Sequence, residues 1–368
     1  MITLSISKGV ICFTNSQQLP YIKQLGIYGN VSEGDTPKNP YNRQSVVRAR
    51  ITRFGKLRDL LCIAPGDYVF LFEKEESKLH GVWRASDEPF YCTCRIFDPS
   101  DDYPYRFYMQ PFLNFPNPVP ITELRKLLDK NILWSIRTFE REIAAGFASI
   151  NPISFNEVQA LLDLFWKYNH KINPTLNLIS YSHLPLQNSI NFHDMVMTSI
   201  TSSNVPLRIE ADDLGQHVRK PLDEEALHCF FIYNLVRGSR QMRELFGEYR
   251  QVLREVPVSV AGQKRADILL IYHNELTGIP SVYSIMEVKR GKVNVHMLSQ
   301  LLEYIRLFSE RHSLNLNSVE GIYVGESFQS DAIKYVKERA KIEVERRLRL
   351  ITYKIIGNKI ELNEINMD

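Results

Sequence analysis

Blocks of apolar residues in the second half of the chain predict a regular succession of helices and strands. A helix is expected over LDEEALHCFFIYNL, and strands over QVLREVPVSV, ADILLIY and SVYSIMEV. HNELTGIP separates the last two strands, and its Asn, Gly and Pro favour a hairpin turn. We then expect the helix VHMLSQLLEYIRLF, the strand GIYVGE, the helix DAIKYVKERAKIEVERRL and the strand RLITYKII. The sheet and helices of this half predict an α/β domain.

The first half has the shorter apolar runs of a β-rich domain. GVICFTN predicts a strand, and GDYVFLFEKEESKLHGVWRAS predicts a hairpin around the charged turn from Glu73 to Lys78. Two helices are expected to follow, over Thr122–Ala145 and Phe155–Lys167. Ser154, with Glu157 three residues later, has the spacing of a capping box at the start of the second helix.

Between the halves the composition changes. INPTLNLISYSHLPLQNSINFHDMVMTSITSSNVPLRIEADD is rich in Asn, Ser, Thr and Pro and has no sustained periodicity. The 368 residues are enough for two domains. We therefore predict domains over residues 1–170 and 216–368, joined by a linker over 171–215.

The strand hairpin predicts a cluster of charged side chains. Asp267 and Glu287 are equally distant from Thr277, so a hairpin folded about Thr277 places them opposite each other. Their Cβ atoms would be about 4.5–5.5 Å apart, where two like charges repel unless a cation lies between them. Lys289 points from the same strand face as Glu287, because strand side chains alternate.

Composition excludes several classes of protein. The chain is 44% hydrophobic and 24% charged, and no apolar run reaches the roughly 18–20 residues that span a bilayer. MITLSISKGVICF lacks the features of a signal peptide, so we expect a cytoplasmic protein without a membrane partner. The five cysteines form no CxxC pair, which argues against a disulfide framework or a zinc ribbon. The net charge of +3 still allows a local basic channel for nucleic acid.

The charged residues and element order of the second half resemble the PD-(D/E)XK nuclease superfamily, over roughly residues 221–356. Asp267, Glu287 and Lys289 match its D, E-x-K residues, with Ala266 where many members have Pro. Gln300 and Tyr304 match the Q-x3-Y pattern of the RecB-like and NucS-like branches. The resemblance implies an αβββαβ restriction-endonuclease-like core. It also implies that Asp267 and Glu287 hold Mg²⁺ or Mn²⁺, and that Lys289 orients or helps deprotonate the attacking water.

The same resemblance implies one more metal ligand from the first core helix. RecB-like members place a His there and NucS-like members a Glu, and this chain offers Glu224, Glu225 and His228. One of these three is expected to complete the site, with Glu225 and His228 as the leading candidates, although the acids could instead stabilise the helix N-terminus. No Cys follows Tyr304, so the iron–sulfur cluster of some RecB-like nucleases is not expected.

Basic residues flank the predicted acids. Lys264, Arg265, Arg290 and Lys292 are candidates for contacts with the DNA backbone, and each could equally be solvated surface.

Residues 8–115 resemble the PUA-like group that includes EVE and YTH domains. The matching segments are VICFTNSQQLPYIKQLGIYGN, PGDYVFLF and LHGVWRASDEPFY. The resemblance implies a β-barrel with appended helices that reads a modified base in an aromatic cage. Tyr28, Trp83 and Phe90 are the cage candidates, and Trp83 could instead pack inside the barrel.

Together the halves predict an α+β protein that is a Mg²⁺-dependent DNA endonuclease. Its first domain would bind a flipped modified base in a DNA duplex, and its second would cut nearby, as in modification-dependent restriction. One alternative is a NucS-like mismatch or structure-specific repair nuclease. Another is a nucleic-acid-binding protein with an inactive nuclease fold, or an RNA reader. Cleavage of both strands would require a homodimer or two successive cuts.

Overall fold

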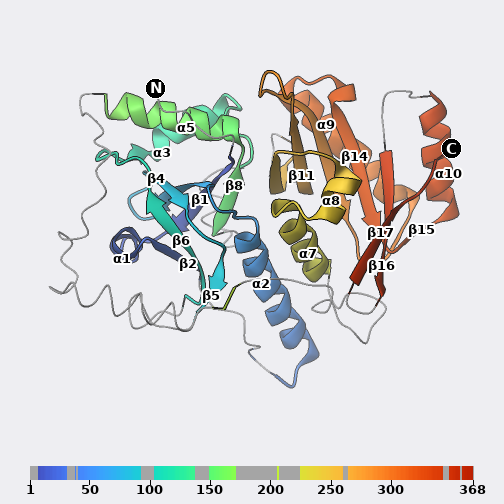
Figure 1. Ribbon diagram of the computed structural model, residues 1–368, viewed down its shortest axis with the longest axis horizontal. Helices are drawn as coiled ribbons and strands as arrows, with labels where there is room; N and C mark the ends of the chain where they lie inside the picture. The colour runs from blue at the N-terminus through green and yellow to red at the C-terminus, as the bar shows by residue number, and fades with distance from the viewer. Residues whose placement is uncertain are drawn as a thin grey trace. The chain divides into compact units, whose positions relative to one another are not determined.

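The computed structural model describes residues 7–30, 38, 40–92, 103–136, 149–170, 205–206, 224–259, 264–342, 348–356 and 359–367. The chain divides into two compact units, Ser7–Arg208 and Ile209–Asp368, called here the N-terminal and C-terminal units. Both contain helices and strands (Figure 1), which confirms the mixed α/β class. Most of the predicted linker, 171–215, lies outside the described residues.

The N-terminal unit is built around a nine-stranded sheet in the order β8-β1-β3-β4-β6-β5-β9, with β2 added to β6 and β7 to β4. Its strands are β1 (Gly9–Thr14), β2 (Ile27–Asn30), β3 (Tyr68–Glu73), β4 (Lys78–Ala85), β5 (Phe90–Tyr91), β6 (Tyr105–Pro111), β7 (Val119–Pro120), β8 (Ile150–Ile153) and β9 (Val205–Pro206). Strand order within the described residues leaves β8 and β9 as the two ends, so closure into a barrel stays a prediction.

The predicted hairpin is confirmed as β3 and β4, which pair antiparallel on either side of Glu73 and Lys78. β3 is buried along its whole length, because β1 pairs with it in parallel on one side and β4 on the other. Phe70 and Phe72 therefore lie fully inside the core of this unit.

Four helices lie in the described part of the N-terminal unit: α1 (Leu19–Leu25), α2 (Arg43–Leu61), α3 (Ile121–Asp129) and α5 (Phe155–Tyr168). The capping box of Ser154 and Glu157 is confirmed at the start of α5. α3 is shorter than the predicted helix Thr122–Ala145. It ends at Asp129, and Asn131 adopts a left-handed conformation with φ 54°. Residues 137–148 lie outside the described residues.

The C-terminal unit contains a six-stranded sheet in the order β10-β11-β12-β14-β16-β17. The strands of the unit are β10 (Gln251–Pro257), β11 (Arg265–His273), β12 (Pro280–Val288), β13 (Lys292–Val293), β14 (Val319–Gly325), β15 (Ser327–Phe328), β16 (Leu348–Ile356) and β17 (Lys359–Glu364). β13 and β15 pair with each other in a separate two-stranded sheet. The helices are α7 (Glu224–Val236), α8 (Arg240–Phe246), α9 (Val295–His312) and α10 (Ser330–Ile342), with a short 3-10 turn at Leu316–Ser318.

This succession confirms the predicted order of a helix, three strands, a helix and a strand, followed by a further helix and strand. β10, β11 and β12 are antiparallel, whereas β14 runs parallel to β12 and to β16. Parallel neighbours require a long crossover, which α9 supplies between β12 and β14. Of the helices in the described ranges, none is both long enough and apolar enough to cross a membrane.

Candidate active site

The hairpin register places two carboxylates at one end of the sheet. Ile268 pairs with Met286, and the same register continues to Tyr272 and Val282, which confirms the predicted fold of the hairpin. Asp267 and Glu287 are the next residues beyond this ladder. The Asp267 amide donates a hydrogen bond to Glu287 Oε1 over 3.3 Å, and the Val288 amide donates to Asp267 Oδ2 over 2.9 Å. Each acid is therefore oriented by the backbone of the opposite strand.

Lys289 lies directly beyond the two acids. Its Nζ is 3.8 Å from Asp267 Oδ2 and donates a hydrogen bond to Glu224 Oε1 over 3.1 Å. Its backbone amide donates to the carbonyl oxygen of Val324, which continues the pairing between β12 and β14. The backbone pairing thus fixes the position of the Lys289 main chain, and the contacts with Asp267 and Glu224 fix the position of its ammonium group.

The charges of this cluster shift one another's protonation. Burial raises the pKa of Glu287, and the neighbouring Asp267 carboxylate raises it further, to about 9. For Lys289, burial lowers the pKa, but the Asp267, Glu224 and Glu287 carboxylates outweigh burial and raise the pKa above its ordinary value. At neutral pH the lysine is therefore charged, and without a cation Glu287 retains its proton.

α7 contributes Glu224 and His228 to the same region. Glu224 also accepts a hydrogen bond from the Arg290 amide over 3.2 Å. His228 Nε2 lies 2.9 Å from the Val288 carbonyl oxygen and 3.5 Å from Asp267 Oδ2. Since a carbonyl oxygen can only accept, Nε2 carries a hydrogen, and this nitrogen is therefore not free to bind a cation while it donates to Val288.

Glu224, at the start of α7, reaches Lys289. Consecutive helical residues point about 100° apart, so Glu225 leaves the helix in a different direction from Glu224. The role of Glu225 as a metal ligand stays a prediction.

Asp267 and Glu287 have a donor set suited to a hard divalent cation. Asp267 Oδ1 and Glu287 Oε2 make no hydrogen bond or ion pair with other described residues, because the backbone contacts use the other oxygen of each carboxylate. Carboxylate oxygens are the ligands that Mg²⁺ and Mn²⁺ prefer. Across the described ranges, no three His, Cys, Asp or Glu side chains form a complete metal-binding group. The two acids therefore fit a cation that keeps much of its water, as Mg²⁺ does.

Sequence reasoning missed a further acid, Glu255 on β10. Arg254 pairs with Ile268 and Val256 with Ala266, so Glu255 stands between them, opposite Asp267. Its φ of 50° is unusual for a residue other than glycine, and its charge adds to those that raise the pKa of Glu287. Nothing in the segment REVP, which contains Glu255, predicted this backbone conformation, because residue type alone does not reveal the φ angle at a single position.

Gln300 and Tyr304 lie one turn apart on α9, as the Q-x3-Y pattern predicts. Gln300 Nε2 donates a hydrogen bond to the Tyr304 hydroxyl over 2.5 Å. Burial raises the pKa of Tyr304, and the Glu287 and Asp267 charges raise it further. Gln300 is exposed whereas Tyr304 is buried, so the hydrogen-bonded pair extends from the surface into the interior of the unit.

The loop after Lys289 lies close against the end of β14. The Glu326 amide donates to the Gly291 carbonyl oxygen over 3.2 Å, and the Tyr353 hydroxyl donates to the Arg290 carbonyl oxygen. A Cβ atom on Gly325 would lie 2.5 Å from Val293 Cγ2 and 3.3 Å from the Gly291 carbonyl oxygen. Gly325 is therefore needed for this close approach.

The four predicted backbone-binding residues differ in exposure. Arg290 and Lys292 are exposed, and neither side chain makes a hydrogen bond or ion pair with a described residue. Lys264 forms an ion pair with Glu303, with 2.5 Å between Nζ and Oε2, and Arg265 is only partly exposed. Arg290 and Lys292 are thus the two best placed to meet an external anion.

The three predicted cage aromatics of the N-terminal unit are buried. Tyr28, Trp83 and Phe90 are each exposed by 3% or less. The Tyr28 hydroxyl donates to the carbonyl oxygens of Phe13 and Ser149, and Phe90 stacks on Tyr108 with ring centroids 4.6 Å apart. Their role in a base-binding cage stays a prediction.

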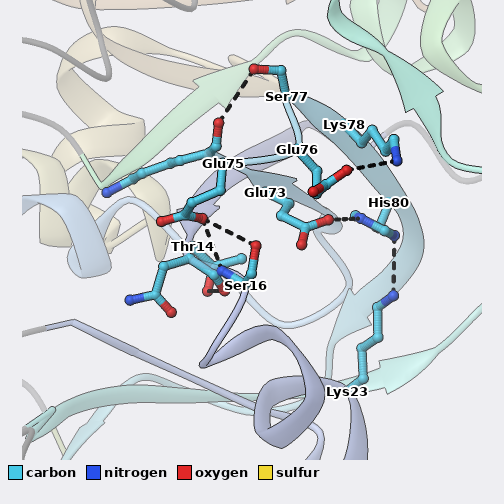
Figure 2. Close-up of polar contacts among 11 residues, drawn as sticks. Thr14, Ser16, Lys23, Glu73, Glu75, Glu76, Ser77, Lys78 and His80 are labelled. Carbon is cyan, nitrogen blue, oxygen red and sulfur yellow. Dashed lines mark hydrogen bonds and ion pairs between the residues drawn. The ribbon is translucent and has the colours of Figure 1, made fainter.

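A second group of titratable side chains lies between α1 and the β3–β4 hairpin (Figure 2). His80 Nε2 is 2.9 Å from Glu73 Oε2, and His80 Nδ1 is 3.1 Å from Lys23 Nζ. Burial lowers the pKa of His80, and Lys23 lowers it further, whereas Glu73 acts in the opposite direction. Lys23, His80 and Glu73 thus form a connected chain of polar contacts.

Comparison with known proteins gives limited information. No protein-family model matches the chain, and no curated protein matches it. Among solved structures, a repair endonuclease from Pyrococcus abyssi is 20% identical over 34% of this chain and 45% of that one, with a TM-score of 0.24. An EndoMS–dsDNA2 complex is 22% identical over 30% of this chain and 43% of that one, with a TM-score of 0.21.

A hypothetical protein from Leishmania major is 9% identical over 45% of this chain and 99% of that one, with a TM-score of 0.29. This chain thus covers less than half the length of the Pyrococcus abyssi endonuclease and of the chain in the EndoMS–dsDNA2 complex. All three TM-scores lie below 0.5, so the function must be inferred from the site geometry.

Proposed function

We propose that the C-terminal unit hydrolyses phosphodiester bonds in DNA with the help of a divalent cation. The observation that carries this proposal is the meeting of Asp267, Glu287 and Lys289 at the end of two paired strands, with 3.8 Å between Lys289 Nζ and Asp267 Oδ2. Two acids and a lysine on one sheet face are the D, E-x-K set of the nuclease superfamily that the sequence resembles.

Asp267 and Glu287 would hold the cation through the carboxylate oxygens that the backbone leaves unused. A bound divalent cation lowers the pKa of water and neutralises charge that develops on the phosphate. Glu287 must lose its proton for this role, because its carboxyl is protonated at neutral pH without a cation.

Lys289 acts through its positive charge. The surrounding carboxylates raise the pKa of Lys289, so its ammonium group keeps its proton at neutral pH and is a poor general base. The charged group would instead orient water and stabilise negative charge on the non-bridging phosphate oxygens. Gln300 and Tyr304 would hold the strand being cut beside this group.

Cleavage of labelled duplex DNA tests the proposal. With Mg²⁺ or Mn²⁺ we expect cutting by the full-length protein, and EDTA abolishes it because the two acids then have no cation to hold. Glu287→Gln and Lys289→Gln should each lower the cleavage rate by about 10²-fold or more, in line with the loss of one electrostatic catalytic group.

Two exposed residues of the same sheet provide matched controls. Glu361→Gln and Lys354→Gln remove the same charges from β17 and β16, where both side chains face solvent. Cleavage should be unchanged in both. Equal cutting by Glu287→Gln and Glu361→Gln would remove the assignment.

The feature of DNA that selects the substrate is a separate question. The substrate classes proposed are a duplex that carries a modified base, as in restriction of foreign DNA, and a mismatched or branched duplex, as in repair. The first class rests on the cage that Tyr28, Trp83 and Phe90 are predicted to form, and these rings are buried. Cleavage of modified perfect duplex, compared with unmodified mismatched duplex, separates the two.

A further inference from the structure

The N-terminal unit carries an unusually basic helix, α2. Its sequence RQSVVRARITRFGKLRDLL contains six Arg or Lys residues and a single acid, Asp59, which is buried near the helix end. Arg43, Arg48 and Arg53 are exposed. No acid of the helix lies near them in sequence, so the first part of α2 has a strong and uncompensated positive charge.

Among the described side chains of this helix, burial is greatest at its end. Leu60 and Leu61 are fully buried, whereas most of the described side chains before Phe54 are exposed or partly exposed. In Figure 1 the first part of α2 extends away from the strands of its own unit. A helix that packs along its whole length has its polar residues on one side and an apolar stripe on the other. Arg48 is instead rotated by about 140° from Arg43 around the helix axis, and Arg53 by a further 140° or so, so the three point in different directions. The charges therefore surround the projecting part.

The arginine side chains are available to an external anion. Within the described part of the chain, neither the Arg43 nor the Arg48 side chain makes a hydrogen bond or ion pair, and Arg53 contacts only the Phe54 ring, at 5.8 Å. From Arg43 to Arg53 the helix rises about 15 Å, a length along which duplex DNA presents several phosphates. Guanidinium groups bind phosphate oxygens in a bidentate manner, which lysine cannot do.

We propose that the projecting half of α2 binds the phosphate backbone of duplex DNA. The choice of DNA as the polyanion rests on the function proposed above for the C-terminal unit, whereas the polyanion-binding surface rests on α2 itself. An anionic membrane fits less well, because a helix that lies in a lipid surface keeps its charges on one side, whereas Arg43, Arg48 and Arg53 point in different directions around the axis of α2. The contact reads no sequence, since it is made to phosphates.

The test measures binding of a labelled 30-base-pair duplex in EDTA over a series of salt concentrations. The triple variant Arg43→Gln, Arg48→Gln, Arg53→Gln keeps good helix formers in α2. Removing one phosphate-binding charge reduces the slope of log affinity against log salt by about 0.9, so we expect a slope smaller by roughly 2 to 3. Affinity at low salt should fall about tenfold or more.

A matched control removes three charges elsewhere on the same unit. Lys126 and Lys130 at α3 and Lys167 on α5 are exposed, and Figure 1 shows these helices well apart from α2. Replacing all three with Gln should leave the slope nearly unchanged. If the triple α2 variant does not fold, as judged by circular dichroism, the double variant Arg43→Gln, Arg48→Gln takes its place, with a slope expected to be smaller by roughly 1 to 2.

Binding and cleavage distinguish the two proposals. Unchanged duplex affinity and salt slope in the α2 variants overturn this inference, as does a loss of binding confined to anionic lipid vesicles or to single-stranded RNA. If the α2 variants lose duplex binding while no DNA is cut under any condition, the inference stands and the nuclease proposal fails. If the protein cuts DNA but the α2 variants leave the salt slope unchanged, the nuclease proposal stands and this inference fails.

Discussion

At Glu287, burial and the adjacent Asp267 carboxylate act in the same direction on the side chain, and both raise its pKa. In the folded protein without a cation the carboxyl thus keeps its proton up to about pH 9, whereas an unfolded chain releases it near pH 4.5. Between these values the folded state binds more protons than the unfolded state, so stability falls as pH rises.

Glu287→Gln should therefore stabilise the metal-free protein. The amide cannot ionise, so it avoids the cost of placing a second negative charge beside Asp267. We expect the free energy of unfolding in EDTA to rise by up to about 5 kcal/mol at pH 8, and by less than about 1 kcal/mol at pH 5. Denaturant unfolding of the two proteins at both pH values measures this. A variant with equal or lower stability at pH 8 would show that Glu287 is not under electrostatic strain.

Sequence alone predicted the acids and lysine of the site because strand geometry is regular. Side chains alternate, and a hairpin turn fixes which residues meet, so Asp267, Glu287 and Lys289 could be placed together from spacing alone. The N-terminal aromatics could not be placed in this way. A Tyr or Trp in a strand can fill the core or line a pocket, and only the position of the opposing layer decides which.

At the scale of elements, a helix could be predicted from the sequence where its local signals were strong. α5 has both a capping box and an apolar stripe, and its bounds were predicted to within a residue. α2 has neither, because its charges lie on all sides, and the sequence analysis did not anticipate it. Glu157 shows why the capping box is decisive: its carboxylate also accepts hydrogen bonds from the Trp134 and Ser135 amides, which ties the start of α5 to the chain after α3.

The cluster of Lys23, His80 and Glu73 should make the N-terminal unit sensitive to pH (Figure 2). Burial and Lys23 lower the pKa of His80, so the folded state resists a proton that an unfolded chain binds near pH 6.5. The stability that neutral His80 allows above about pH 6.5 is therefore lost as the pH falls below that value. We expect the free energy of unfolding to decrease from pH 7 to pH 5.

His80→Gln should weaken this dependence, because glutamine does not titrate. Tryptophan fluorescence during denaturant unfolding at each pH provides the measurement, since all three tryptophans, Trp83, Trp134 and Trp166, belong to the N-terminal unit. His170→Gln is the matched control, because His170 is exposed near the end of α5. Identical pH profiles for His80→Gln and the unmodified protein would contradict the expectation.

At the scale of the whole molecule, each unit encloses its own apolar core. Phe70 is fully buried in the sheet of the N-terminal unit, and Ile322 is fully buried in that of the C-terminal unit. Removing most of a buried side chain costs about 2–5 kcal/mol, and that cost falls on the unit that contains the cavity.

We therefore expect the two core variants to affect different signals. Phe70→Ala should lower the denaturant midpoint of tryptophan fluorescence, whereas Ile322→Ala should leave that midpoint in place and change the transition seen by far-ultraviolet circular dichroism. Equal displacement of the fluorescence midpoint by both variants would mean that the units unfold as one.

Gly325 lies outside the cluster of Asp267, Glu287 and Lys289, but the packing of the segment after Lys289 depends on it. A methyl group there would collide with Val293 and crowd the Gly291 carbonyl, so this segment would have to move. The movement should weaken the proposed nuclease activity while every side chain of the cluster is still present. Screens for inactive variants of the proposed nuclease should therefore recover substitutions of Gly325 as well as of the acids.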